Sequence, residues 1–472
     1  NAVGETAIRA NSTEVLDTFA GTSQIGAGVL AGTVVINSIE TSTEAIVENG
    51  AQISSINQDS RFQSDGEFSP GASQVVIISA DDHSTINGVA GSIGVGGIAG
   101  AGASVDVGRI HNRVVAAVGP QAQISAVGDI SILADSHREL DSQVIAFAGG
   151  LAGLSGAVSV QSIGAPVGTR ADSEFDLGSG GETLRGQTND ALTNPDISSA
   201  IDYSNSEGGA VSVIAQQAAG SANSVGGATV ESSTSAITGR ELLTAAFIDD
   251  GSEGNGASII SGGTITIDAN NRYKVDQEVG SAALGGLSVG AAVGEVSIAN
   301  AVHAYTGEHS RLEATGDIVV RAQDAEHESA QAGEQAANLS IFAGAAGLIG
   351  VSTNTGELTL TSETSAQLNN HSAITGADNI VVEALQQGDI NIDGEGYSLG
   401  LAAAGGMDLD ARVIGTVDAG IGSDVRIDNA NNLTLRANSD GSARSDAILG
   451  AGGLLAVEDA DINTLIDLDT TA

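Results

Sequence analysis

The chain of 472 residues contains no cysteine and no tryptophan, and only one methionine, seven phenylalanines and four tyrosines. The absence of cysteine excludes disulfide bonds and thiolate metal sites, and it suits a protein that works outside the cell. The scarcity of aromatic residues excludes the thick core of an ordinary globular domain, although 41% of the residues are hydrophobic. Alanine, valine, isoleucine and leucine supply most of that fraction, so we expect a core between closely spaced walls.

Positive charge is also scarce. The sequence has 16 lysine and arginine residues, with Lys274 as the single lysine, against 59 aspartate and glutamate residues, for a formal charge of −43. Such a chain repels phosphate backbones, which argues against nucleic acid as a partner. It remains soluble by self-repulsion and attracts divalent cations. No continuous apolar run is long enough to predict a membrane span.

One short phrase recurs along the chain. It reads Gly-Asp-Ile-Ser-Ile-Leu-Ala at residues 128–134, and near-copies end at closing alanines that are separated by 70, 54, 81, 54, 53, 62 and 53 residues. A fixed period of this kind is the signature of a stacked repeat architecture. The eight closing alanines are Ala10, Ala80, Ala134, Ala215, Ala269, Ala322, Ala384 and Ala437.

Each copy alternates apolar and polar residues, as in the pairs Ile130/Ile132 and Ile265/Ile267, which indicates a strand with one buried face. A Gly/Ala-rich segment, a longer strand and a short closing strand follow. The sequence therefore predicts an all-β fold: an elongated parallel β-solenoid, or right-handed β-helix, of about eight repeats of ~54 residues. Two coils of roughly 27 residues per repeat would give a rod on the order of 80 Å long. One wide coil or three narrow ones remain open.

The chain reads as a single repeat array over residues 1–472, and its long spacings locate three loop insertions. They are expected at about residues 54–71, 176–208 and 323–334. Loops that project from a rigid scaffold are common places for binding, and they are also tolerated as plain surface insertions. We expect no catalytic residue and no cofactor apart from calcium, because the sequence contains no recognised catalytic motif.

Two acidic clusters are candidates for a weak calcium site, since carboxylate oxygens are preferred calcium ligands. The alternative is diffuse screening of a charged face by cations. The first cluster is Asp249, Asp250 and Glu253, and the second is Glu458, Asp459 and Asp461.

Several phrases, Gly32-Thr-Val-Val-Ile-Asn37 with Gly50-Ala-Gln-Ile53 and residues 128–134, resemble repeats of very large bacterial exoproteins. These are the filamentous-haemagglutinin-like adhesins and their leukotoxin-like relatives. The resemblance spans essentially the whole chain and rests on short motifs. It implies an extended right-handed parallel β-helix that is secreted to the cell surface.

The sequence thus favours a non-enzymatic extracellular structural protein, either the stalk of a surface adhesin or a segment or subunit of an extracellular filament. The alternative is a β-helical carbohydrate-active enzyme or glycan-binding protein. The expected partners are further copies of the chain, joined head to tail, and the cell surface or its glycans. In a head-to-tail joint, residues 461–469 would pair with residues 3–10 of the next copy, unless the chain is a segment of a longer array that continues covalently.

Overall fold

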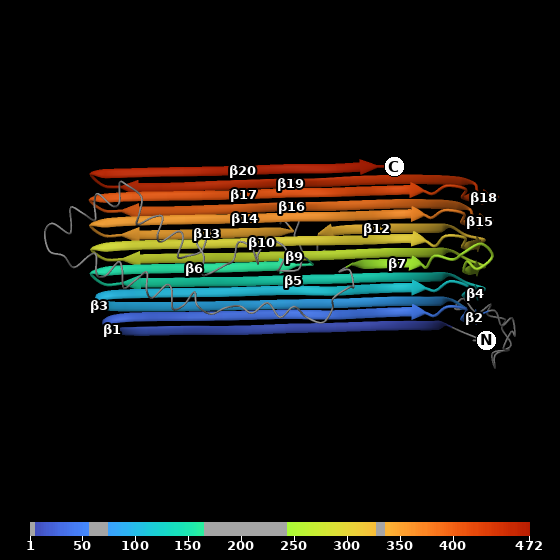
Figure 1. Cartoon of the computed structure of the whole chain (residues 1–472), viewed down its shortest axis with the longest axis horizontal. Helices are drawn as coiled ribbons and strands as arrows, with labels where there is room; N and C mark the ends of the chain where they lie inside the picture. Colours follow the sequence, from blue (N-terminus) through green and yellow to red (C-terminus); the bar gives the residue numbers. More distant parts are fainter. Residues whose placement is uncertain (1–4, 56–73, 165–242, 327–335) are drawn as a thin grey trace, which may run out of the picture.

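The computed structural model describes residues 5–55, 74–164, 243–326 and 336–472. Within these residues the protein is all-β, with 20 strands and no helix. The strands lie side by side in a stack that runs from β1 to β20, with short strands at one end of the long ones (Figure 1). Every pairing between the described strands is parallel.

The chain repeats a first pass, a second pass that runs back, and a short closing strand, and we call these three together a coil. The first passes are β5 (Ile130–Gly149), β9 (Ile265–Leu284), β12 (Ile318–Glu326) with β13 (Ala337–Ala346), β16 (Asn379–Leu399) and β19 (Asn432–Gly452). The second passes are β6 (Ala152–Ile163) with β7 (Thr244–Ile248), β10 (Leu287–Thr306), β14 (Ile349–Leu368), β17 (Ala402–Ile421) and β20 (Leu455–Thr471). Both passes of a coil are contained in β1 (Thr6–Val47) and in β3 (Val76–Val118). The closing strands are β2 (Gln52–Ser55), β4 (Gln123–Ala126), β8 (Ser258–Ser261), β11 (Arg311–Ala314), β15 (Ala373–Thr375) and β18 (Arg426–Asp428).

Neighbouring coils pair in the register of the sequence repeat. Ile265 pairs with Ile318, and Ile380 with Leu433, so each of these shifts is 53 residues. One repeat therefore makes one wide coil, and the prediction of two coils of about 27 residues is wrong. The reason is that the strand does not turn after its closing alanine but continues, in β5, as far as Gly149.

The closing alanines form one column, with one departure from the prediction. Ala215 lies outside the described residues, and Ala134 pairs directly with Ala269. The prediction that eight copies stack consecutively is thus wrong at this point, and the described residues make seven first passes. The paired alanines are Ala10–Ala80, Ala80–Ala134, Ala134–Ala269, Ala269–Ala322, Ala322–Ala384 and Ala384–Ala437.

Two passes are interrupted. β12 and β13 both lie between β9 and β16, and β6 and β7 both lie between β3 and β10. The predicted insertion at residues 176–208 lies outside the described residues, as do most of those at 54–71 and 323–334. Residues 54–55 and 323–326, which were assigned to these loops, belong instead to β2 and β12.

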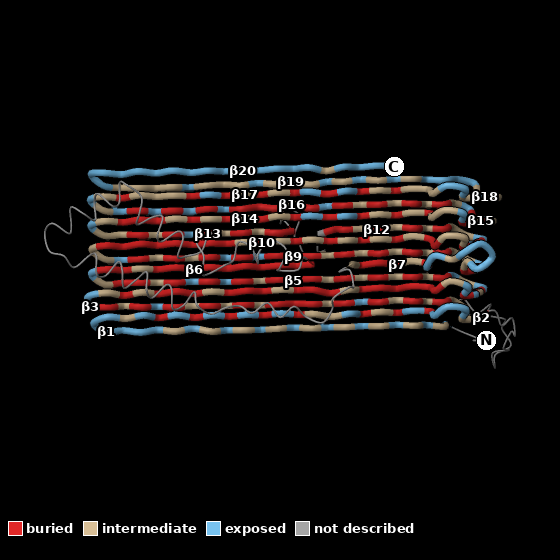
Figure 2. The backbone as a smooth tube through the Cα atoms, in the orientation of Figure 1, coloured by how far each residue is buried: buried red, intermediate tan, exposed pale blue. Residues whose placement is uncertain are grey.

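The interior contains two apolar clusters. The three-walled core lies where both passes meet the closing strands, and it includes Ile132, Ile259 and Ala304. The two-walled core lies between the remaining parts of the passes, where only two strands face each other, and it includes Leu140, Ile298 and Leu339. Figure 2 shows burial throughout the middle of the stack and exposure at its two edges, β1 and β20.

The overall shape differs from the predicted rod. A pass of 20 residues such as β9 spans about 65 Å, whereas seven strands stacked about 4.8 Å apart span only about 30 Å. The long axis of the described structure therefore follows the strands (Figure 1). The prediction of an ~80 Å stack is wrong because it assumed two coils per repeat.

Candidate functional site

A row of polar residues crosses the interior between the two cores, and we call it the polar belt. It occupies the second position after each stacked closing alanine, where the side chain faces inward. Asp82, Ser136, Asn271, Asp324 and Gln386 are buried at this position. In the outermost coils, Ser12 pairs with Asp82, and Ser439 with Gln386, in the same column. This row was not predicted, although a polar residue two positions after every stacked alanine is visible in the sequence.

Asp324 is a fully buried carboxylate of the polar belt, and its oxygens accept several hydrogen bonds. Ser362 Oγ donates at 2.5 Å, Asn271 Nδ2 at 2.7 Å, and Asn300 Nδ2 at 3.1 and 3.2 Å to the two oxygens. Burial raises the pKa of Asp324 above its ordinary value of 3.8, while these hydrogen bonds and the charge of Arg138 act against the rise.

Arg138 is the buried cation beside the polar belt. Its guanidinium donates to Asn300 Oδ1 at 3.3 Å and to the Asn112 carbonyl oxygen at 3.4 Å. Burial lowers the pKa of Arg138 to about 10, and the charges of Asp82 and Asp324 oppose this shift. Arg138 remains charged at neutral pH and partly balances two buried carboxylates, so the polar belt is a structural network rather than an open binding site.

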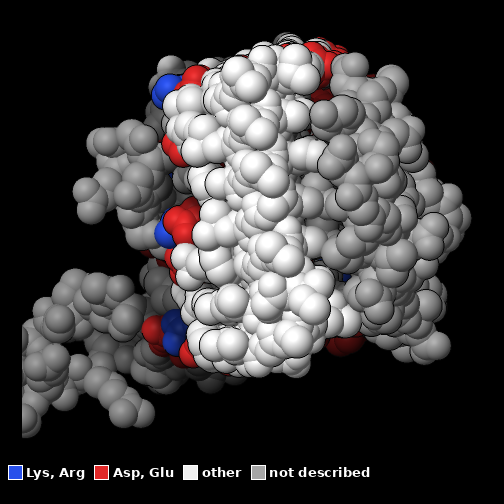
Figure 3. Space-filling model, turned by 90° about the vertical axis from the view of Figure 1, so that its left-hand side faces the viewer, with Lys and Arg blue, Asp and Glu red and all other residues white. Residues whose placement is uncertain are grey.

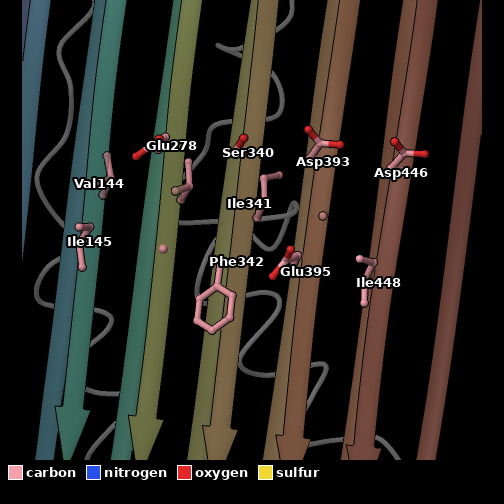
Figure 4. A pocket seen from close by; sticks show the side chains of 13 residues that line it. Val144, Ile145, Glu278, Ser340, Ile341, Phe342, Asp393, Glu395, Asp446 and Ile448 are labelled. Atoms are coloured by element: carbon pink, nitrogen blue, oxygen red, sulfur yellow. The ribbon is translucent and has the colours of Figure 1, made fainter.

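A surface groove lies on the outer face of the first passes, and we call it the acidic groove. It has a volume of about 440 Å³ and crosses β5, β9, β13, β16 and β19 (Figure 4). Both carboxylates and apolar side chains line it. Its outward-facing residues are Ile145, Glu278, Ser340, Phe342, Asp393, Glu395, Asp446 and Ile448.

The strand register aligns these side chains in two rows. One row continues from Glu278 through Ser340 and Asp393 to Asp446 on successive strands. The other continues from Ile145 through Gly280, Phe342 and Glu395 to Ile448. A carboxylate row and a partly aromatic row therefore lie side by side, two residues apart along each strand (Figure 4).

The first predicted calcium cluster lies in the turn between β7 and β8. Asp249 Oδ1 accepts the backbone N–H of Asp250 at 2.9 Å, and Asp250 Oδ1 accepts that of Glu308 at 2.9 Å. The first carboxylate thus accepts a backbone N–H of its own turn, and the second accepts one from the neighbouring coil. Glu253 lies farther along the same turn and is exposed.

The second predicted cluster lies in β20. Glu458 and Asp459 are consecutive residues of a strand, so their side chains point to opposite faces, and Asp461 shares the face of Asp459. The three carboxylates therefore do not converge. In the described part of the chain, no group of three or more histidine, cysteine, aspartate or glutamate residues is arranged to hold a metal ion.

The edge formed by the tight turns is apolar. Leu151, Leu348, Leu401 and Leu454 are exposed there, and the turns stack through bonds such as Leu401 N–H to the Leu348 carbonyl oxygen at 2.8 Å. Figure 3 shows this edge as a strip without charge, with charged residues to one side of it. No helix in the described segments has the length and hydrophobicity needed to cross a membrane.

Comparisons of the chain with protein-family models, with curated proteins and with solved structures find no match.

Proposed function

We propose that the protein is an extracellular structural element: a right-handed β-solenoid that serves as a stalk segment of a surface adhesin or as a unit of an extracellular filament. The observation that carries this proposal is the in-register parallel pairing of successive coils, such as β9 with β12 and β16 with β19. Each coil offers the next one the same pattern of backbone donors and acceptors. A protein of this kind works by stacking and does not need a catalytic centre.

The two edges of the stack support continuation into a further coil. Among the strands that the structure describes, β19 and β20 pair on one side only, and so do both halves of β1. The column of closing alanines contains Ala10 at one edge and Ala437 at the other. A joint that preserves this column would pair β19 with the first half of β1, and β20 with its second half.

We propose this joint in place of the one expected from the sequence. Residues 461–469 lie in a second pass, whereas residues 6–10 lie in a first pass, and these belong to opposite walls. If these two segments paired, the column of closing alanines would not continue from one copy into the next. The next coil in the proposed joint belongs either to a second copy or to the same, longer polypeptide.

Charge and composition support the extracellular setting. The chain has no cysteine, and a surface with a formal charge of −43 resists sideways association. Among the described residues, every lysine and arginine except the buried Arg138 forms an ion pair with a carboxylate. Few free cations therefore remain on the described surface to bind anionic partners.

The experiment is cryo-electron microscopy of the isolated chain at rising concentration, with Leu435→Asp as the comparison. Stacked copies should repeat about every 34 Å, which is seven coils at about 4.8 Å each. Leu435→Asp, which puts a charge into the terminal coil, should abolish the stacks. Single particles at all concentrations, together with a native polypeptide of only this length, would contradict the proposal.

The alternative function, a glycan-binding or carbohydrate-active protein, has one feature in its favour. The acidic groove combines carboxylates with the partly exposed Phe342, a combination that sugar-binding surfaces use. Incubation with bacterial and host polysaccharides, followed by analysis of bound and cleaved products, tests this alternative directly.

A further inference from the structure

The hollow of the acidic groove exists because Gly280 has no side chain. Gly280 lies between Ile145 and Phe342 in the same row of the sheet. A Cβ at this glycine would meet nothing closer than 3.9 Å, so the space above it is open. Ile145 and Phe342 therefore form two apolar walls around a gap one strand wide.

Phe342 lies against the sheet because of a second glycine. A Cβ at Gly344, two residues later, would lie 3.1 Å from the Phe342 Cζ atom, so a side chain there would push the ring away by a few tenths of an ångström. Tyr397 on the next strand lies with its ring centre 6.2 Å from that of Phe342. Both rings are more than one third exposed, at 38% and 39%, and offer aromatic surface to a ligand.

The charge of the groove is only partly balanced. Asp446 pairs with Arg444, while Glu278 and Asp393 accept neutral amide donors, Gln143 Nε2 and Asn391 Nδ2, both at 2.8 Å. No lysine, arginine or histidine in the described ranges forms a salt bridge with Glu278, Asp393 or Glu395. Three carboxylates beside an aromatic ring fit an ammonium group, which ring faces and carboxylates both attract.

We propose that the acidic groove binds a linear alkylammonium chain, with its ammonium groups between Phe342 and the carboxylates Glu278, Asp393 and Glu395 and its methylene groups on Ile145. The unbalanced carboxylates Asp393 and Glu395 are two residues apart on one strand and therefore lie about 6.6 Å apart. That spacing is close to the distance between nitrogens across a short alkyl spacer. A polyamine and a lysine-rich peptide segment share this chemistry.

The test is isothermal titration of the whole chain with spermidine in about 0.15 M salt, where diffuse attraction is screened beyond about 8 Å. Phe342→Ala should weaken binding about two- to fivefold, the amount expected for an exposed cation–π contact. Glu395→Gln should weaken it by a similar factor. Glu363→Gln on β14 removes the same charge from an exposed site away from the groove and should leave binding unchanged.

Three outcomes would overturn the proposal. One is equal weakening by Glu395→Gln and Glu363→Gln, which would show diffuse attraction to an acidic surface. Another is unchanged binding in Phe342→Ala with its circular dichroism preserved. The third is selective binding of a neutral oligosaccharide that spermidine does not displace. Competition between spermidine and an oligolysine peptide on the wild-type chain then distinguishes the two sources of the ligand.

Discussion

The three-walled core and the two-walled core obey different packing rules, although the same strands build both. In the three-walled core each wall repeats nearly the same side chain from coil to coil, as at Ile132, Ile267 and Leu435. Side chains from three directions meet there, so a change in one coil has no empty space to use. This core therefore enforces a sequence repeat.

The two-walled core permits exchange of volume between its walls. A Cβ at Gly294 would lie 2.5 Å from Leu339 Cδ1, and one at Gly356 would lie 2.6 Å from Ile341 Cδ1. In both cases a large residue on the first pass fills the space opposite a glycine on the second pass. The combined volume of the two facing side chains is maintained while each one varies. The residues in this region are therefore less similar from coil to coil.

The largest expected effect comes from a charge in the three-walled core. Ile267→Asp should lower the free energy of unfolding by about 4 kcal/mol or more, because Ile267 is fully buried in the apolar cluster. Ile267→Val, the matched control, should cost about 1 kcal/mol. Urea unfolding followed by circular dichroism measures both variants. A small loss for Ile267→Asp would contradict the tight packing of this core.

A size exchange tests the two-walled core. Gly294→Ala should cost about 1–3 kcal/mol, because the new methyl group overlaps Leu339. Leu339→Ala should also destabilise the protein, by about 2–5 kcal/mol. The double variant should lose less than the sum of the two single losses, because the methyl group then occupies vacated space. Strict additivity would show that the two walls do not exchange volume.

The polar belt between the two cores should make stability depend on pH. Asp324 has a raised pKa in the folded state, so its protonation favours folding. The resulting stability is fully present below the unfolded value near 3.8 and is lost as the pH rises through the folded pKa. Asp324→Asn should flatten the pH dependence of the unfolding midpoint across this window, whereas the control Asp389→Asn, at a half-buried position, should not. If the unfolding midpoint of Asp324→Asn depends on pH as steeply as that of the wild type, Asp324 is not the source of the pH dependence.

The smallest effect is expected on the outer face beside the three-walled core. Arg321 Nη2 lies 2.5 Å from Asp268 Oδ2, and both residues are partly exposed. Arg321→Gln should cost less than about 1 kcal/mol, and added salt should reduce the difference further. A loss as large as that of Ile267→Asp would show that the outer face, and not the interior, determines the stacking.

The contrast between the cores also explains what could be read from the sequence. The strands of Ile132 and Ile267 were predicted because their residues repeat, and the structure places both residues in one column with Leu435. The width of the coil was not predicted because residues 135–149 lie in the two-walled core. Their side chains differ from those at the same positions in other coils. Their alternating burial in β5 becomes clear only when the facing strand is known.

The acidic groove could not be predicted for a different reason. Glu278, Phe342 and Asp393 meet only through the register of β9, β13 and β16. An interruption of the pass separates β12 from β13, so a fixed period does not place Phe342 in its column. The acidic cluster predicted in β20 shows the same limit, because consecutive residues of a strand point to opposite faces and so do not converge.

The width of the coil has a mechanical consequence. A coil consumes 53 residues or more, with 53 between Ile265 and Ile318, to advance by a single strand spacing of about 4.8 Å. A tensile load along the stack acts on the backbone hydrogen bonds of both long passes at once, so they share the force. The protein therefore gains little length per residue but resists a high force before two coils separate. Each joint between coils should break abruptly under load rather than extend gradually.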